Sequence, residues 1–176
     1  MNSYEGVVYD LDGTLVRLNV DWDQAEVDVA ARFRQQGIDP DGHDLWDLLD
    51  RAYSEGFDSL LERTLSEHER EGARSSDLLP AAAALPLSVP TAVCSLNCEA
   101  ACRIALETHG LDRDVDAIVG RDTVDTYKPH PEPLLEAVRR LATPPEQTLF
   151  VGDSERDALT AERAGIDFRH VNDYLD

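Results

Sequence analysis

Short apolar runs recur along the chain, each ending in a small or polar residue. Five of them are typical of strands buried on both faces of a parallel sheet. The predicted strands are residues 6–10, 91–95, 116–120, 148–152 and 167–171. The first of these runs reads Gly-Val-Val-Tyr-Asp, so an acidic residue stands at its carboxyl end.

Apolar positions at helical spacing fill most of the remaining chain. This period of three to four residues predicts helices at 21–36, 44–53, 57–71, 98–109, 131–141 and 156–164, with a short helix at 81–84. Trp22 and Trp46 fall on two of these helices, where we interpret them as packing residues, one of which can line a pocket.

The order of these elements predicts the fold class. From residue 80 onward, strands alternate with helices through short links, which indicates an α/β fold with a doubly wound parallel sheet. Residues 16–79 contain helices and no convincing strand. We therefore predict a core of residues 1–16 and 80–176, interrupted by a small α-helical insert at 17–79.

Charge and hydropathy argue against a nucleic-acid-binding protein and against a membrane protein. The net charge is −20, from 36 acidic and 16 basic residues, so a phosphate backbone would be repelled and nucleic acid is not an expected partner. No apolar run approaches the roughly 18–20 residues of a membrane span. The amino terminus lacks a basic start and an apolar secretory core, which leads us to expect a cytoplasmic protein that does not bind membranes.

The cysteines do not predict a metal centre. Cys94, Cys98 and Cys102 are spaced four apart, but Cys94 falls in a predicted strand and the other two in a helix. No known zinc spacing matches, so we expect buried free thiols. The sequence leaves the oligomeric state open.

An acidic motif follows the first predicted strand. Asp10 and Asp12 lie two residues apart at its carboxyl end, and Gly13 permits a sharp bend there. That edge of an open α/β sheet is where ligands bind. Two close carboxylates are unfavourable unless a cation or a proton lies between them, so the motif indicates metal-assisted chemistry.

Other candidate groups come at the same predicted edge. Ser95 and Asn97 follow the second strand, where each alone is typical of a helix cap. Lys128 is the only lysine of the chain and lies in a proline-rich turn. Asp153 and Asp157 follow the fourth strand, and a helix start alone would explain them. Together these groups predict a Mg²⁺ site with hard oxygen ligands beside a cation that binds phosphate.

The motifs together resemble the haloacid dehalogenase superfamily, in its Mg²⁺-dependent phosphatase branch. The matching segments, in the order of that family, are 10–15 (Asp-Leu-Asp-Gly-Thr-Leu), Ser95, Lys128 with its prolines, and 152–157 (Gly-Asp-Ser-Glu-Arg-Asp). The resemblance implies a Rossmann-like core with a helical cap in the position of the insert. It also implies Mg²⁺ as cofactor and a small phosphorylated metabolite as substrate, hydrolysed as by phosphoglycolate phosphatases.

The resemblance assigns roles in phosphoryl transfer. Asp10 would be the nucleophile that becomes phosphorylated, and Asp12 the general acid and base. Ser95 would bind a phosphoryl oxygen, and Lys128 would hold the nucleophile and the phosphate.

The resemblance also assigns a metal site. Asp10, the backbone carbonyl of Asp12, and Asp153 would bind Mg²⁺, with Asp157 doing so directly or through water. Asn97 is a further substrate contact and Thr14 a neighbour of the site. Relatives often carry Asn directly after the motif serine, whereas here Leu96 intervenes, so the role of Asn97 is open.

Two other functions share these residues. A sugar-phosphate phosphomutase would need a cap that holds a phosphorylated intermediate, and residues 17–79 offer few basic residues beside glycine-rich loops, so we rank this function lower. A phosphorylated signalling module resembling a response-regulator receiver would carry its acceptor on the third strand, not the first. The choice among phosphoglycolate-type acids, sugar phosphates and nucleoside monophosphates stays open.

The acidic composition generates the first testable prediction. It resembles that of haloarchaeal proteins, in which salt screens the repulsion between surface charges. We expect the chain to lose structure in dilute buffer and to regain it in molar KCl, as measured by circular dichroism. Full stability without salt would contradict this reading.

Overall fold

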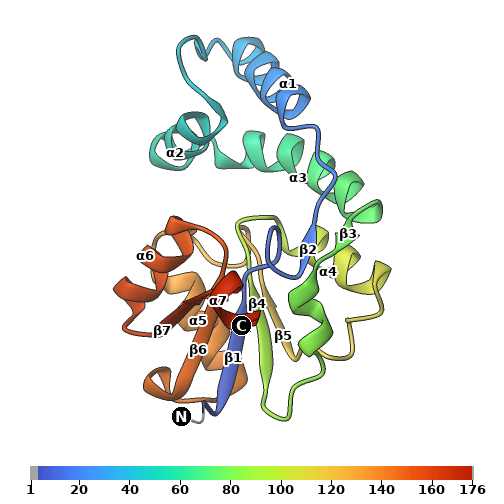
Figure 1. Cartoon of the computed structure of the whole chain (residues 1–176). Helices are drawn as coiled ribbons and strands as arrows, with labels where there is room; N and C mark the ends of the chain where they lie inside the picture. Colours follow the sequence, from blue (N-terminus) through green and yellow to red (C-terminus); the bar gives the residue numbers. More distant parts are fainter. Residues whose placement is uncertain (1–3, 176) are drawn as a thin grey trace.

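Five parallel strands form the central sheet (Figure 1). The structure is a computed structural model that describes residues 4–175, so residues 1–3 and 176 of the predicted core lie outside the described residues. The strands are β1 (Gly6–Tyr9), β4 (Thr91–Cys94), β5 (Ala117–Val119), β6 (Thr148–Gly152) and β7 (Asp167–His170), in the order β5-β4-β1-β6-β7. The predicted α/β fold with a doubly wound parallel sheet is confirmed.

Helices cover both faces of this sheet. Val7 and Tyr9 of β1 point to one face and pack in a cluster with α4 (Glu99–Thr108) and the short α7 (Val171–Leu175). Val8 points to the other face, against α5 (Glu132–Leu141) and α6 (Glu155–Ala164). Because every residue of β1 is buried, the residues that follow it are held firmly at the centre of the carboxyl edge.

A separate helical unit stands beyond that edge. It consists of α1 (Trp22–Gln35), α2 (Leu45–Glu55) and α3 (Asp58–Arg74), and Figure 1 shows all three above the carboxyl ends of the strands. The unit has its own apolar cluster, which includes Val29, Phe33, Leu48, Leu49 and Leu61. These are the positions that helical spacing predicts to be buried. The limits of the insert, 17–79, stay a prediction.

Two short strands join the helical unit to the sheet and correct one prediction. β2 (Val16–Arg17) and β3 (Asp77–Leu78) pair antiparallel, whereas no strand was expected between residues 16 and 79. Two residues are too few to show the alternation that marks a strand in sequence. The predicted short helix at 81–84 is the 3₁₀-helix η1 (Pro80–Ala84), and a second one, η2 (Pro145–Gln147), precedes β6.

Buried charge fastens the helical unit to the loops after β4 and β5. Arg121, only 1% exposed, follows β5 and forms ion pairs with Glu62 (2.6 Å) and Glu69 (2.5 Å) of α3. It also donates to the carbonyl of Leu96 at 2.7 Å. Glu69 in turn accepts from the backbone N–H of Cys98 at 2.9 Å. One guanidinium thus holds α3 and the loop after β4 together.

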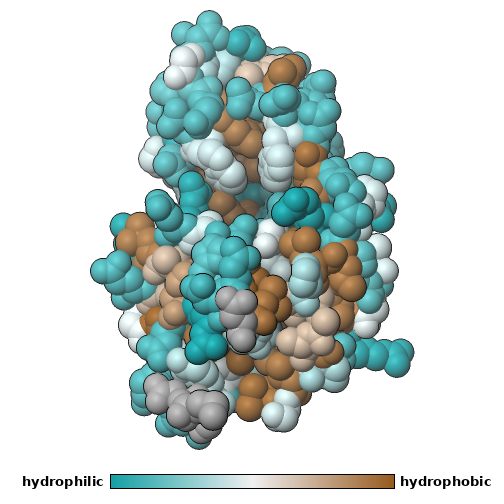
Figure 2. All heavy atoms as spheres, viewed as in Figure 1, coloured by the Kyte–Doolittle hydropathy of each residue, from teal (hydrophilic) through white to brown (hydrophobic). Residues whose placement is uncertain are grey.

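The surface and the cysteines agree with the composition. Hydrophilic residues dominate the outer face of the helical unit seen in Figure 2. Among residues 4–175 there is no helix both long enough and apolar enough to cross a membrane. The three cysteines are free and buried, as predicted.

The Arg121 network generates a stability prediction. Replacing Arg121 with Met leaves Glu69 buried without its charge partner, which typically costs about 3–5 kcal/mol. The control is Arg74→Met, because Arg74 forms an exposed pair with Glu71 that is expected to contribute at most about 1 kcal/mol. Urea unfolding at constant KCl concentration measures both free energies. Equal losses in the two variants would contradict this account of the joint.

Candidate active site

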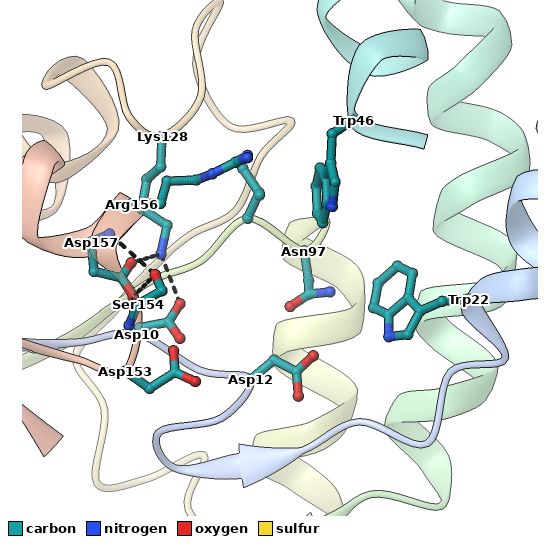
Figure 3. Close-up of a pocket in the computed structure, with 11 residues that line it drawn as sticks. Asp10, Asp12, Trp22, Trp46, Asn97, Lys128, Asp153, Ser154, Arg156 and Asp157 are labelled. Carbon is teal, nitrogen blue, oxygen red and sulfur yellow. Dashed lines mark hydrogen bonds and ion pairs between the residues drawn. The ribbon is translucent and has the colours of Figure 1, made fainter. Parts of the chain in front are cut away.

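A pocket of about 320 Å³ lies between the carboxyl edge of the sheet and the helical unit (Figure 3). Its floor comes from the loops after β1 and β6 and from the turn that carries Lys128, and its far wall comes from α1 and α2. The lining residues are Asp10, Asp12, Trp22, Trp46, Leu96, Asn97, Lys128, Asp153, Ser154, Arg156 and Asp157. The predicted acidic residues and Lys128 therefore converge from distant segments.

The loop after β1 turns tightly and carries two of these residues. Asp10 continues the sheet by donating its backbone N–H to the carbonyl of Val151 at 2.8 Å. The turn closes because the carbonyl of Leu11 accepts hydrogen bonds from the backbone N–H groups of Thr14, Leu15 and Val16. Gly13 adopts φ +90°, a conformation that other residues rarely take.

Lys128 is the countercharge of the acidic cluster. Its ammonium is 3% exposed and donates to Asp10 Oδ1 at 2.7 Å and to Asp157 Oδ1 at 2.5 Å. The ring of Phe150 lies 5.6 Å below it. Since no other cation of the described chain contacts these two carboxylates, Lys128 fixes their relative position.

Burial and neighbouring charge shift the titration of these groups. Burial raises the pKa of Asp10 to about 7, while the charge of Lys128 opposes the shift and Asp157 adds to it. Burial also favours a raised pKa at Asp157, but Lys128 and hydrogen bonds from Ser154 outweigh it and lower that pKa. Burial disfavours the charged form of Lys128, yet Asp10 and Asp157 raise its pKa above the ordinary value. Lys128 therefore stays protonated.

The start of α6 positions the third and fourth acidic residues. Ser154 caps the helix and forms a capping box with Asp157, whose Oδ2 accepts from the Ser154 hydroxyl at 2.6 Å. Asp153 precedes the cap, and its pKa is raised by burial and by the charge of Asp157. A side chain at Gly152 would press on the Cβ of Asp157 at 2.7 Å, so glycine is needed there for the close approach.

Three carboxylates lie close enough to hold a metal ion together. Oxygen atoms of Asp10, Asp153 and Asp157 all lie within 4.8 Å of one another. With Mg²⁺–oxygen bonds of ~2.1 Å, these three carboxylates would hold one ion after their oxygens move closer together. The hard-oxygen donor set also suits Mg²⁺. The carboxylate of Asp12 is outside this group, and its predicted contact through the backbone carbonyl stays a prediction.

Asp12 points toward the helical unit instead. Its Oδ1 accepts the backbone N–H of Leu18 at 2.9 Å, which fixes the side chain beside the pocket. Burial raises the pKa of Asp12, against the effect of that hydrogen bond. A carboxyl group with a raised pKa that lines the pocket is suited to give and take a proton.

The loop after β4 places its predicted residues differently. Leu96 and Asn97 line the pocket, whereas Ser95 is buried beside it and is not a lining residue. The Ser95 hydroxyl donates to Asn97 Oδ1 and accepts the Asn97 N–H, both at 3.1 Å. Thr14 makes only a long contact of 3.4 Å with Asp10 Oδ2. The roles of Ser95, Asn97 and Thr14 stay predictions.

The far wall contains residues that sequence reasoning missed or undervalued. Both Trp22 and Trp46 line the pocket, with ring centroids 6.4 Å apart, whereas the sequence indicated packing residues of which one could line a pocket. Arg156 lies over the Trp46 ring at 4.7 Å. Its place within a catalytic motif was the available signal. The contact of Arg156 with Trp46 on α2 could not be predicted, because the two residues are more than a hundred positions apart in the sequence.

Sequence comparisons give one consistent match. Residues 7–171 match the family model described as "Haloacid dehalogenase-like hydrolase". The chain is 31% identical over 185 aligned positions to the phosphoglycolate phosphatase of Cereibacter sphaeroides, covering 93% of this chain and 83% of that protein. It is 30% identical over 190 positions to the phosphoglycolate phosphatase of Rhodospirillum rubrum, covering 92% and 77%.

A solved structure shows the same fold. The crystal structure of CbbY from Rhodobacter sphaeroides in complex with phosphate superposes with a TM-score of 0.66 at 19% identity. The match covers 95% of this chain and 85% of that one.

The glycine turn after β1 generates a prediction about metal binding. A Cβ at Gly13 would collide with Asp153 Oδ2, whereas one at Gly37 (φ +76°) would meet nothing within 4 Å. Both Gly13→Ala and Gly37→Ala should destabilise the fold by about 1–2 kcal/mol through their backbone conformation. Only Gly13→Ala should weaken Mg²⁺ binding, by about 10- to 100-fold, as measured by isothermal titration calorimetry. Unchanged Mg²⁺ affinity in Gly13→Ala would argue against Asp153 as a ligand.

Proposed function

The chain belongs to the haloacid dehalogenase-like hydrolase family, and we propose that it hydrolyses small phosphate monoesters through an aspartyl-phosphate intermediate with Mg²⁺ as cofactor. The observation that carries the proposal is the buried Lys128 ammonium between Asp10 and Asp157. Asp153 lies close enough to these two carboxylates to bind one metal ion together with them. Such a cluster both binds a cation and leaves a carboxylate facing a pocket of substrate size.

The residues of the chain divide the reaction into two steps. In the first, a carboxylate oxygen of Asp10 bonds to phosphorus, the ester P–O bond breaks, and Asp12 protonates the departing oxygen. In the second, Asp12 takes a proton from water, the water oxygen bonds to phosphorus, and the Asp10–phosphorus bond breaks. Inorganic phosphate leaves, and Asp10 is a free carboxylate again.

The remaining polar groups bind and orient. Lys128 holds Asp10 and offsets the charge of the phosphoryl group. Asp10, Asp153 and Asp157, with the Asp12 carbonyl, would hold Mg²⁺, which when bound supplies positive charge against the phosphoryl oxygens. Ser95 and Asn97 are the proposed phosphoryl contacts from the loop after β4.

The named relatives and the pocket size suggest the first substrate to test. Both full-length relatives are phosphoglycolate phosphatases, and a cavity of about 320 Å³ accepts a molecule of that size. The receiver-like alternative is not favoured, because Asp10 follows β1 and not a third strand of the sheet. A cytoplasmic location stays a prediction of the sequence.

A phosphate-release assay over a panel of monoesters, with Mg²⁺ and molar KCl, tests this function. We expect turnover by the wild type, no turnover by Asp10→Asn, and accumulation of phosphoenzyme in Asp12→Asn, because that variant lacks the base for the second step. Acid-quenched gels with labelled substrate measure the phosphoenzyme. Asp112→Asn, in the turn after α4, is a matched control that removes one exposed carboxylate without touching the pocket.

Either of two outcomes would contradict the proposal. One is unchanged turnover in Asp10→Asn. The other is a wild type that forms a lasting phosphoprotein without releasing phosphate, which would favour a signalling module.

A further inference from the structure

The pocket has two ends of opposite character. The acidic end is formed by Asp10, Asp153 and Asp157 around Lys128, and the reaction proposed above takes place there. The other end is formed by the indoles of Trp22 and Trp46 and by Arg156 (Figure 3). The phosphoryl group occupies the acidic end, so the rest of the substrate must face the second end.

Arg156 forms no ion pair with a carboxylate among the described residues. Seven other arginines do form one: Arg34, Arg51, Arg74, Arg103, Arg121, Arg139 and Arg140. Further arginines share this lack of a carboxylate partner, and Arg156 differs from them because it lines the pocket. Lys128, the other cation of the pocket, is already bonded to two aspartates. Of the two cations that line the described pocket, Arg156 is therefore the one available to bind a ligand.

The contact with Trp46 leaves the binding edge of this guanidinium available. A cation over the face of an indole is held by electrostatic attraction, which engages none of the guanidinium N–H donors in a conventional hydrogen bond. That planar fork matches a carboxylate or a phosphate and binds it through two parallel hydrogen bonds. Trp46, which is 40% exposed at the start of α2, would hold the fork in place.

The negative charge of the pocket explains why a free cation is needed there. Asp10, Asp12, Asp153 and Asp157 make the pocket repel an anionic leaving group, and Lys128 is engaged with the first and last of them. We propose that Arg156 binds a second anionic group, a carboxylate or a phosphate, on the leaving-group side of the substrate, and that Trp46 is its positioning residue. The proposal rests on the phosphatase activity proposed above and makes Arg156 the determinant of substrate class.

Matched substrates and variants test this assignment. The substrates are phosphoglycolate, pyrophosphate and hydroxyethyl phosphate, which is close to phosphoglycolate in size but has a neutral leaving group. The variants are Arg156→Gln, Arg156→Lys and Trp46→Leu, with Arg74→Gln as a control that removes one exposed positive charge at the far end of α3. Assays use the lowest KCl concentration that keeps the fold, because the screening length falls to about 3 Å at 1 M salt.

The expected result is a loss confined to the anionic substrates. Arg156→Gln should lower kcat/KM about 10- to 100-fold for the substrate whose second group it binds, mainly through KM, and leave hydroxyethyl phosphate within about threefold. Phosphoglycolate and pyrophosphate distinguish a carboxylate from a phosphate as that group. Arg156→Lys should restore part of the loss, and Trp46→Leu should cause a smaller loss with the same selectivity.

Other results would overturn the inference. Equal losses on all three substrates would mean that the Arg156–Trp46 contact only docks α2 on α6, and no loss on either anionic substrate would mean that Arg156 meets solvent. In both cases the wild-type rate on hydroxyethyl phosphate would leave the proposed function standing. If the wild type released phosphate from no monoester, both the proposed phosphatase function and the role of Arg156 would be contradicted. Thermal unfolding of each variant separates a binding defect from a folding defect.

Discussion

The mutual repulsion of carboxylates that must lie close together is the constraint on which this structure depends. Asp10 and Asp157 share one buried ammonium, and Asp153 approaches them without such a partner. Asp10 and Asp157 are buried, and one ammonium offsets only one of their two negative charges, whereas Asp153 is exposed to solvent. The same imbalance gives the site its affinity for a divalent cation. The cluster is assembled at the carboxyl ends of two fully buried strands, β1 and β6.

A second buried ion network, centred on Arg121, fixes the orientation of the helical unit on the sheet. The helical unit has its own apolar cluster and could dock in more than one orientation if only apolar contacts joined it to the sheet. The hydrogen bonds of Arg121 to Glu62, Glu69 and the Leu96 carbonyl demand one geometry. Tyr127 adds a hydrogen bond to Asp50 and an edge-on contact with Tyr53, both on α2. The two tryptophans of the far wall are thereby held opposite the acidic cluster.

Local signals predicted most of the fold and part of the site. The five strands and six main helices leave clear periodicities, and the acidic motif and the Asp153 motif were recognisable because each directly follows a strand. Lys128 was recognisable as the only lysine of the sequence, in a proline-rich turn. The pair β2 and β3 was missed because two residues carry no period. Arg121 was missed because its partners lie on a helix some fifty residues away, and Arg156 because its partner is on α2. What sequence reasoning lacked was the docking of the helical unit, which depends on long-range contacts alone.

The burial of Lys128 has a practical consequence for chemical probes of this protein. It is the only lysine in the chain, and its ammonium is enclosed by two aspartates. Amine-directed acylating reagents therefore find no exposed lysine side chain in the part of the chain that the structure describes. Slow acylation at the ε-amine would report how often the catalytic cleft opens to bulk solvent.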